Sequence, residues 1–311
     1  MIRSRAFTKL LSGLLLPLGA TAPGCCPTAA EPAAMPAAAP AAAPAAAAGG
    51  PIRLIARGDD MGFCHAANVA CIRAYREGIM RSVEVMSPAP WFYEAAAMLR
   101  ENGGLDVGVH LTLTCEWANY KWGPITPSPS LATKEGYFAP STKGFLDGKP
   151  DLAEVERELR AQIERAMRHI PQVSHLSCHM GTPTARADLR AIVDKLAAEY
   201  RLPVRIDGVR GGFGFWGEPA DKKKALLAEK LESLGPGLWI FVCHPALETA
   251  ETRAIGGMGD NDANVRMAVH RQTVTDILTD PDIRRIIQRR NIQLISYADA
   301  LAVGNKPGHE P

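Results

Sequence analysis

The sequence predicts an α/β fold, in which a single β/α-barrel-like domain has about seven parallel strands with helices outside them. Two observations lead to this prediction. From residue 51 onward, short apolar runs typical of strands alternate with longer segments of helical periodicity. Side chains suited to catalysis or metal binding follow the ends of several apolar runs. An open doubly wound sheet fits the alternation equally well, and in both architectures active sites lie at the carboxyl ends of the strands.

The expected elements follow one another in regular order. Strands are expected at residues 52–56, 82–86, 105–113, 172–176, 204–206, 238–243 and 292–295. Helices are expected at residues 66–77, 91–100, 151–168, 187–200, 219–234, 264–279 and 281–290. Residues 114–150 and 247–263 are rich in Gly and polar residues and predict long loops. Loops of this length usually have a function or are disordered.

The composition is that of an ordinary soluble globular protein, with 47% hydrophobic and 22% charged residues among 311. A formal net charge of +2 gives no sign of the clustered basic face that a nucleic-acid partner would require. The 7 cysteines include no CxxC pair, which argues against a zinc ribbon or a thioredoxin-like centre. Disulfides between Cys64 and Cys71, or between Cys178 and Cys243, are left open for an oxidising compartment.

The first 50 residues are expected to lie outside the folded domain, which spans residues 51–304 and precedes a tail at 305–311. Residues 1–25 combine a positively charged start with a short apolar stretch, which is typical of an export signal and too short to span a membrane. Cys25 follows a small residue, as in bacterial lipoproteins, but Ala22 stands where Leu is usual, so lipidation and simple cleavage both remain open. Residues 26–50 are mostly Ala and Pro and indicate a linker. We therefore expect an exported protein, either periplasmic or anchored to the envelope as a lipoprotein.

Ionisable side chains gather at the ends of four expected strands, in the order Asp59 and Asp60, His110, His175 and His179, and His244. A single His at such a place is more often structural than a ligand. Four histidines and an Asp pair on one rim instead indicate a metal or catalytic site. Three protein ligands with an open position for water suit zinc, and also harder cations such as magnesium. Adjacent Asp side chains point to different sides of an extended backbone, so one can bind the ion while the other acts as a base.

Five segments resemble the YdjC-like carbohydrate deacetylases, which are related to diacetylchitooligosaccharide deacetylase and the HpnK group. They are residues 54–63 with the Asp-Asp-Met-Gly sequence, residues 68–86 with Glu-Gly-Ile and Ser82, residues 104–114 with Gly-Val-His-Leu-Thr, residues 175–179 with His-Leu-Ser-Cys-His, and residues 243–246 with Cys-His-Pro-Ala. The resemblance covers about residues 52–300. It implies a β/α-barrel-like fold and removal of acetyl groups from N-acetylated amino sugars.

The resemblance also implies roles for individual residues. Asp60, His110 and His179 match the metal ligands, Asp59 matches the general base, and His244 matches a rim residue suited to act as general acid. Substrate contacts are expected from Arg57, Trp122 and His175. For Arg57 the alternative is a surface charge. For Trp122, and for Trp117 and Trp216 in the other loops, the alternative to stacking on a sugar ring is core packing.

The sequence departs from the family pattern near the fourth strand. Ser177 stands where the family usually has Asp, and residues 180–182 replace a His-rich continuation. In the first motif, Arg57 and Gly58 stand where Asn and Ala are usual. These changes alter the surroundings of the ligands and the substrate groove, and groups around the ligands tune metal affinity.

The leading hypothesis is a hydrolase with one divalent metal ion, Mg or Zn, that removes N-acetyl groups from amino sugars or N-acetylated oligosaccharides by attack of a metal-bound water. Asp59 would take the proton of the water and His244 would protonate the departing amine. One alternative keeps the metal but hydrolyses another amide or an ester. The other is a non-catalytic carbohydrate-binding protein of the envelope. The expected partner is the sugar substrate, with membrane contact only through a lipid anchor, and assembly as a homodimer is left open.

Overall fold

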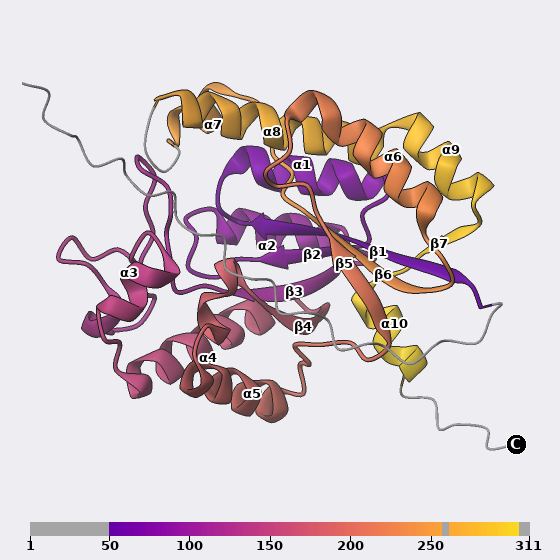
Figure 1. Ribbon diagram of the computed structural model, residues 1–311. Helices are drawn as coiled ribbons and strands as arrows, with labels where there is room; N and C mark the ends of the chain where they lie inside the picture. Colours follow the sequence, from indigo (N-terminus) through magenta and orange to yellow (C-terminus); the bar gives the residue numbers. More distant parts are fainter. Residues whose placement is uncertain (1–49, 257–260, 305–311) are drawn as a thin grey trace, which may run out of the picture. The chain divides into compact units, whose positions relative to one another are not determined.

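The computed structural model describes residues 50–256 and 261–304 (Figure 1). The expected export signal, the lipidation site at Cys25, the linker up to residue 49 and the tail at 305–311 lie outside the described residues and stay predictions. No helix in the described ranges has the length and apolar character needed to cross a membrane.

Parallel strands form one sheet that curls into a half-barrel with helices around it, as the sequence predicts (Figure 1). The strands are β1 (Ile52–Met61), β2 (Ser82–Val85), β3 (Asp106–Leu111), β4 (Val173–Cys178), β5 (Val209–Phe213), β6 (Gly237–Cys243) and β7 (Ile292–Leu294). Their order is β4-β3-β2-β1-β6-β5, and β7 pairs with the start of β1. Strand β1 is central, because β6 pairs along one edge while β7 and then β2 share the other.

Helices cover the sheet on two sides. They are α1 (His65–Arg76), α2 (Phe92–Glu101), α3 (Thr142–Asp147), α4 (Leu152–His169), α5 (Ala187–Tyr200), α6 (Lys223–Ser233), α7 (Ala250–Ala254), α8 (Asn261–Thr279), α9 (Pro281–Arg289) and α10 (Tyr297–Gly304). In Figure 1, α1, α6, α8 and α9 lie above the sheet, and α4, α5 and α10 lie below it. The expected helices are all present, with ends shifted by a few residues.

Strands β2, β3 and β4 separate an apolar face from a polar face, because successive side chains of a strand point in opposite directions. The apolar positions, which include Val83, Val85, Val107, Val109 and Leu176, belong to the main hydrophobic core. The alternating positions are buried and polar: Ser82, Glu84, Asp106, His110, His175 and Ser177. Helix α10 covers this second face, where the Tyr297 ring stacks on His175 with centroids 4.0 Å apart. A buried polar layer therefore lies below the strand ends.

Some expectations differ from the structure. The expected strand at residues 204–206 is wrong, because the fifth strand is β5, whose Val-Arg-Gly-Gly-Phe sequence lacks an apolar run and forms one edge of the sheet. The expected loop at 114–150 contains α3, which begins after Ser141, whose hydroxyl accepts a hydrogen bond from the Gly144 amide at 3.0 Å. The expected loop at 247–263 contains α7, which begins with a capping box at Thr249. The five cysteines in the described ranges are free, so neither disulfide left open by the sequence is formed.

Candidate metal centre and active site

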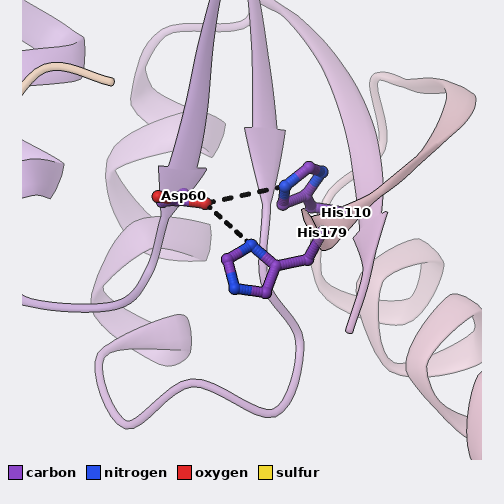
Figure 2. A group of neighbouring side chains, drawn as sticks. All are labelled: Asp60, His110 and His179. Atoms are coloured by element: carbon purple, nitrogen blue, oxygen red, sulfur yellow. Dashed lines mark ion pairs between the residues drawn. The ribbon is translucent and has the colours of Figure 1, made fainter. Parts of the chain in front are cut away.

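Three of the expected rim residues meet at the carboxyl ends of β1, β3 and β4 (Figure 2). Asp60 Oδ1 lies 3.2 Å from His179 Nδ1 and 3.6 Å from His110 Nε2. One ligand atom from each residue lies within 4.8 Å of the other two, and all three side chains are buried. The strand ends thus bring together residues that are far apart in the sequence.

The backbone at the end of β1 turns Asp60 toward the two histidines. Asp60 has a left-handed φ of 69°, and the pairing of β1 with β2 is irregular between Gly58 and Met61. Gly62 follows with φ of 99°, and its amide donates to the Asn68 side chain at 2.7 Å. A left-handed conformation is uncommon for residues other than Gly, although Asp adopts it more readily than most. This turn sends the carboxylates of Asp59 and Asp60 to different partners.

The donor set of this trio fits a divalent ion. Asp60 Oδ2 accepts a hydrogen bond from Arg271 Nη2 at 2.8 Å, whereas the buried Oδ1 accepts no well-aligned hydrogen bond among the described residues and has His179 Nδ1 as its ion-pair partner at 3.2 Å. A buried carboxylate oxygen without a well-aligned hydrogen bond is costly, and a cation offsets that cost. Tetrahedral zinc bonds of roughly 2.0–2.1 Å separate ligand atoms by about 3.4 Å, close to the separations around Oδ1. One carboxylate and two imidazoles suit zinc, and also harder cations that keep bound water.

The charges around the trio favour a positive group at its centre. Burial alone would raise the pKa of Asp60, but Arg271 and His244 outweigh it and hold that pKa well below its usual value. Burial and the neighbouring His179 lower the pKa of His110 to about 3, so His110 is neutral. Burial lowers the pKa of His179, but Glu116 and Asp60 more than reverse this and raise it to about 10.

Each of the two histidines has a polar partner on its other nitrogen. His179 Nε2 lies 3.0 Å from Glu116 Oε2, and His110 Nδ1 lies 2.7 Å from Ser177 Oγ. Such partners orient histidines that bind metals. Glu116 was not expected from the sequence, because the loop after β3 has no periodic pattern to indicate which side chains face the site. Arg271 was also missed, because α8 shows no sequence signal that it packs over the end of β1.

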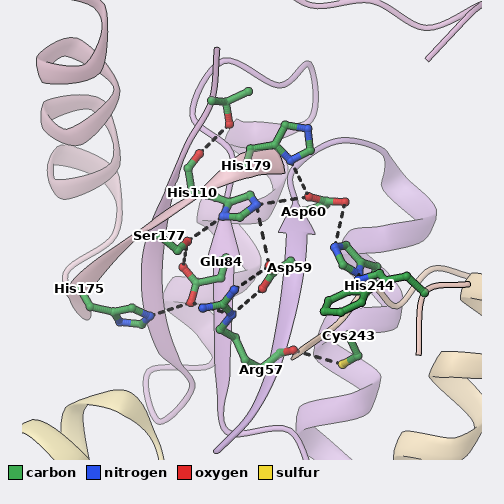
Figure 3. Close-up of polar contacts among 12 residues, drawn as sticks. Arg57, Asp59, Asp60, Glu84, His110, His175, Ser177, His179, Cys243 and His244 are labelled. Carbon is green, nitrogen blue, oxygen red and sulfur yellow. Dashed lines mark hydrogen bonds and ion pairs between the residues drawn. The ribbon is translucent and has the colours of Figure 1, made fainter. Parts of the chain in front are cut away.

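Asp59 and His244 lie beside the trio, with Asp59 near His110 and His244 near Asp60 (Figure 3). Asp59 is held by two hydrogen bonds from Arg57, with Nε at 2.7 Å and Nη2 at 2.9 Å, and its Oδ2 lies 3.9 Å from His110 Nε2. Burial raises the pKa of Asp59, although Arg57 opposes the shift. Trp216 Nε1 donates to His244 Nδ1 at 3.0 Å, and His244 Nε2 faces Asp60 Oδ2 at 4.0 Å. Burial lowers the pKa of His244 to about 4.

A pocket of about 820 Å³ opens onto the centre and is lined by Asp59, Asp60, His110, His179 and His244. Of the expected substrate contacts, Arg57 lines this pocket. Trp122 and His175 are buried away from its lining: the Trp122 indole donates to the Thr114 carbonyl at 3.0 Å, and His175 pairs with Glu84. The aromatic residues that line the pocket are Phe215, Trp216 and Phe241, and Trp216 is the most exposed of them, with 59% of its surface accessible.

Comparison with known proteins points to one family. The profile of the YdjC-like protein family matches residues 53–289, which include every residue of the centre. The chain belongs to the YdjC-like family. It is 31% identical over 264 residues to a carbohydrate deacetylase of Thermus thermophilus, with 77% of this chain and 90% of that protein covered. It is 28% identical over 272 residues to a chitooligosaccharide deacetylase of Yersinia enterocolitica, with 79% and 98% covered.

The fold agrees with this family membership. A crystal structure of a proposed cellobiose-phosphate cleavage protein from Enterococcus faecalis superposes with a TM-score of 0.68 at 25% sequence identity. The match covers 80% of this chain and 98% of that structure. The resemblance that the sequence motifs indicate is therefore confirmed for the family and for the fold.

Proposed function

We propose that this YdjC-like protein is a metal-dependent carbohydrate deacetylase that hydrolyses N-acetyl groups of amino sugars or N-acetylated oligosaccharides. The observation that carries the proposal is the buried trio of Asp60, His110 and His179, which opens onto a pocket beside a second carboxylate, Asp59. The names of its relatives, carbohydrate deacetylase and chitooligosaccharide deacetylase, support this reaction class.

A divalent ion at the trio supplies polarisation of the acetyl carbonyl and a more acidic water molecule. The protein's own groups handle the protons. Asp59 lies beside His110 without a direct hydrogen bond to it and is oriented by the two hydrogen bonds from Arg57, so its carboxylate is positioned to accept the proton of the attacking water. His244 is fixed by Trp216, whose indole donates to Nδ1, so the proton of the neutral ring is on Nε2 and faces the centre. This N–H is positioned to donate a hydrogen bond to the departing nitrogen, which leaves with the proton that Asp59 takes from the water.

The pocket supports a sugar as the substrate. Its volume of about 820 Å³ falls in the range of roughly 300–1,000 Å³ that is common for small-molecule sites. The exposed ring of Trp216 lies on its wall and offers an apolar face to a sugar ring. The export signal expected in residues 1–25 leads us to propose that the substrate is met in the periplasm or at the envelope.

The test is acetate release from N-acetylglucosamine oligomers by the full chain in chelator-treated, zinc-loaded and magnesium-loaded states. We expect release only with a metal, and we expect Asp60→Asn and His179→Ala to abolish it. His65→Ala is the matched control, because the His65 side chain is 51% exposed and pairs with Glu94 outside the centre. No release in any state from a protein that binds zinc would overturn the proposed substrate, and a panel of other acylated sugars, amides and esters would then identify the bond.

A further inference from the structure

The proposed reaction makes no direct use of Glu84, a carboxylate buried in the polar layer below the metal centre. Glu84 lies on β2 and has no exposed surface. Its Oε2 accepts a hydrogen bond from Ser177 Oγ, and its Oε1 lies 2.7 Å from His175 Nε2 (Figure 3). Removing a carboxylate from water is costly unless its oxygens are paired, and here both oxygens have partners. A contiguous chain of contacts runs from this carboxylate through Ser177 to His110.

The direction of the hydrogen bonds in this chain follows from the acceptor at each end. His110 Nε2 faces Asp60 Oδ1 and must carry no proton to bind an ion, so the proton of the neutral ring is on Nδ1. That Nδ1–H donates to Ser177 Oγ at 2.7 Å. The Ser177 hydroxyl then donates to Glu84, because an ionised carboxylate can only accept. Glu84 thereby selects the tautomer of His110.

We propose that Glu84 is a positioning residue for the metal centre, which acts through Ser177 to hold His110 in the tautomer and orientation whose Nε2 binds the ion. The proposal rests on the proposed metal site. Ser177 stands at the position where the resemblance predicts Asp, and its hydroxyl carries no charge of its own. The carboxylate that the usual residue would supply from β4 is supplied here from β2.

The register of the sheet allows Glu84 on β2 to supply the carboxylate that an Asp on β4 would otherwise supply. Glu84 pairs with Gly108 across β2 and β3, and Gly108 pairs with His175 across β3 and β4. A Cβ atom at Gly108 would overlap Glu84 Oε2 and would lie 2.5 Å from His175 Nε2. The missing side chain on β3 leaves the space through which Glu84 reaches the partners on β4.

The same layer connects the metal ligand with the expected base. Arg57 Nε lies 2.7 Å from Asp59 Oδ1 and 3.7 Å from Glu84 Oε1. Arg57 Nη1 donates to the Tyr297 hydroxyl at 2.9 Å, which fixes the guanidinium from the α10 side. Loss of the Glu84 charge therefore affects both the orientation of His110 and the charge balance around Asp59.

The test measures zinc affinity by chelator competition in the full chain, with no substrate present. We expect Glu84→Gln and Ser177→Ala each to weaken zinc binding by about 10–100-fold. Combining Ser177→Asp with Glu84→Gln should bring the affinity back to within about threefold of the native value, because the carboxylate then sits beside His110 Nδ1. The control is Glu156→Gln, which alters a Glu–Lys pair with Lys195 between α4 and α5 and should leave zinc affinity unchanged.

A nitrogen-15 NMR measurement of the His110 tautomer gives a readout that a purely structural role would not change. We expect one tautomer, with the proton on Nδ1, in the native protein, and a mixture in Ser177→Ala, which removes one oxygen atom and preserves the packing. Native zinc affinity in both single variants, or a double variant that binds no better than Glu84→Gln, would overturn the proposal. Zinc binding that depends on Glu84 in a protein that releases no acetate would overturn the proposed function alone.

Discussion

Replacing Glu158 by Ala should release the long segment between β3 and α4 from the body of the protein. Glu158 lies on α4 and is fully buried. Its carboxylate accepts hydrogen bonds from the Ile125 amide at 3.1 Å, the Thr126 amide at 3.0 Å and the Thr126 hydroxyl at 2.6 Å. This segment also carries Glu116, the partner of His179, so its anchoring affects the metal centre.

The size of the effect follows from these contacts. A hydrogen bond to a charged group contributes about 1.5–3 kcal/mol, and three of them would sum to roughly 4.5–9 kcal/mol if they were independent. Contacts to one carboxylate are not independent, and water can enter the space left by the side chain. We therefore expect Glu158→Ala to lower the free energy of unfolding by about 3–5 kcal/mol. For a folded region of this size, that corresponds to a fall in Tm of roughly 6–20 °C.

Urea denaturation gives the free energy of unfolding, and limited proteolysis followed by mass spectrometry shows whether residues 112–150 become accessible. Glu164→Ala is the control on the same helix, because Glu164 is exposed and accepts one hydrogen bond, from the Tyr200 hydroxyl at 2.7 Å. We also expect zinc affinity to fall in Glu158→Ala and not in the control. The reasoning fails if the two variants unfold within about 0.5 kcal/mol of each other, since surface substitutions already differ by that much.

Three further predictions concern the centre and the layer below it. Zinc at about 100 times its dissociation constant should stabilise the protein by about 2.7 kcal/mol, and His110→Ala should remove the shift in a thermal melt; an equal shift in that variant would argue for another site. Gly108→Ala should cost about 1–3 kcal/mol in urea unfolding through overlap with Glu84, whereas Gly103→Ala, whose added Cβ meets nothing within 4 Å, should be neutral; equal costs would contradict the close approach. Burial alone would raise the pKa of Glu84, but His175 and Arg57 lower it from 4.5 to about 2, so the stabilisation from its ionised form is complete above pH 4.5 and is lost as the pH falls toward 2. The native protein should therefore lose roughly 3 kcal/mol more than Glu84→Gln across that interval in unfolding measured at several pH values, and parallel curves would contradict the shift.

The sequence predicts most of the fold because apolar runs and helical periodicity reflect which side of each element is buried. It also predicts those site residues that lie at the ends of strands. Parallel strands bring Asp60, His110 and His179 to one rim of the sheet whatever the details of packing. The fifth strand could not be located in this way, because β5 forms an edge of the sheet and contains two Gly residues. A Trp in a loop is a residue type suited to contact a sugar, but Trp122 packs inward against the segment that contains it. Local sequence does not distinguish a Trp that faces the pocket from one that packs in the core.

In the sequence, the residues of the polar layer alternate with apolar residues along each strand. This alternation in a single strand does not show whether its polar side is buried or faces water. Ser-Val-Glu-Val on β2 and Asp-Val-Gly-Val-His-Leu on β3 both alternate, which by itself also describes strands with one side in water. The covering by α10, which begins at Tyr297, together with Arg57 from β1, converts the polar side into a buried one. Once that face is buried, every polar group on it needs a partner, so a change at Glu84, His175 or Ser177 alters the hydrogen bonding of the other two. This dependence accounts for the place of Ser177 beneath the three candidate ligands, at the position where the resemblance predicts Asp.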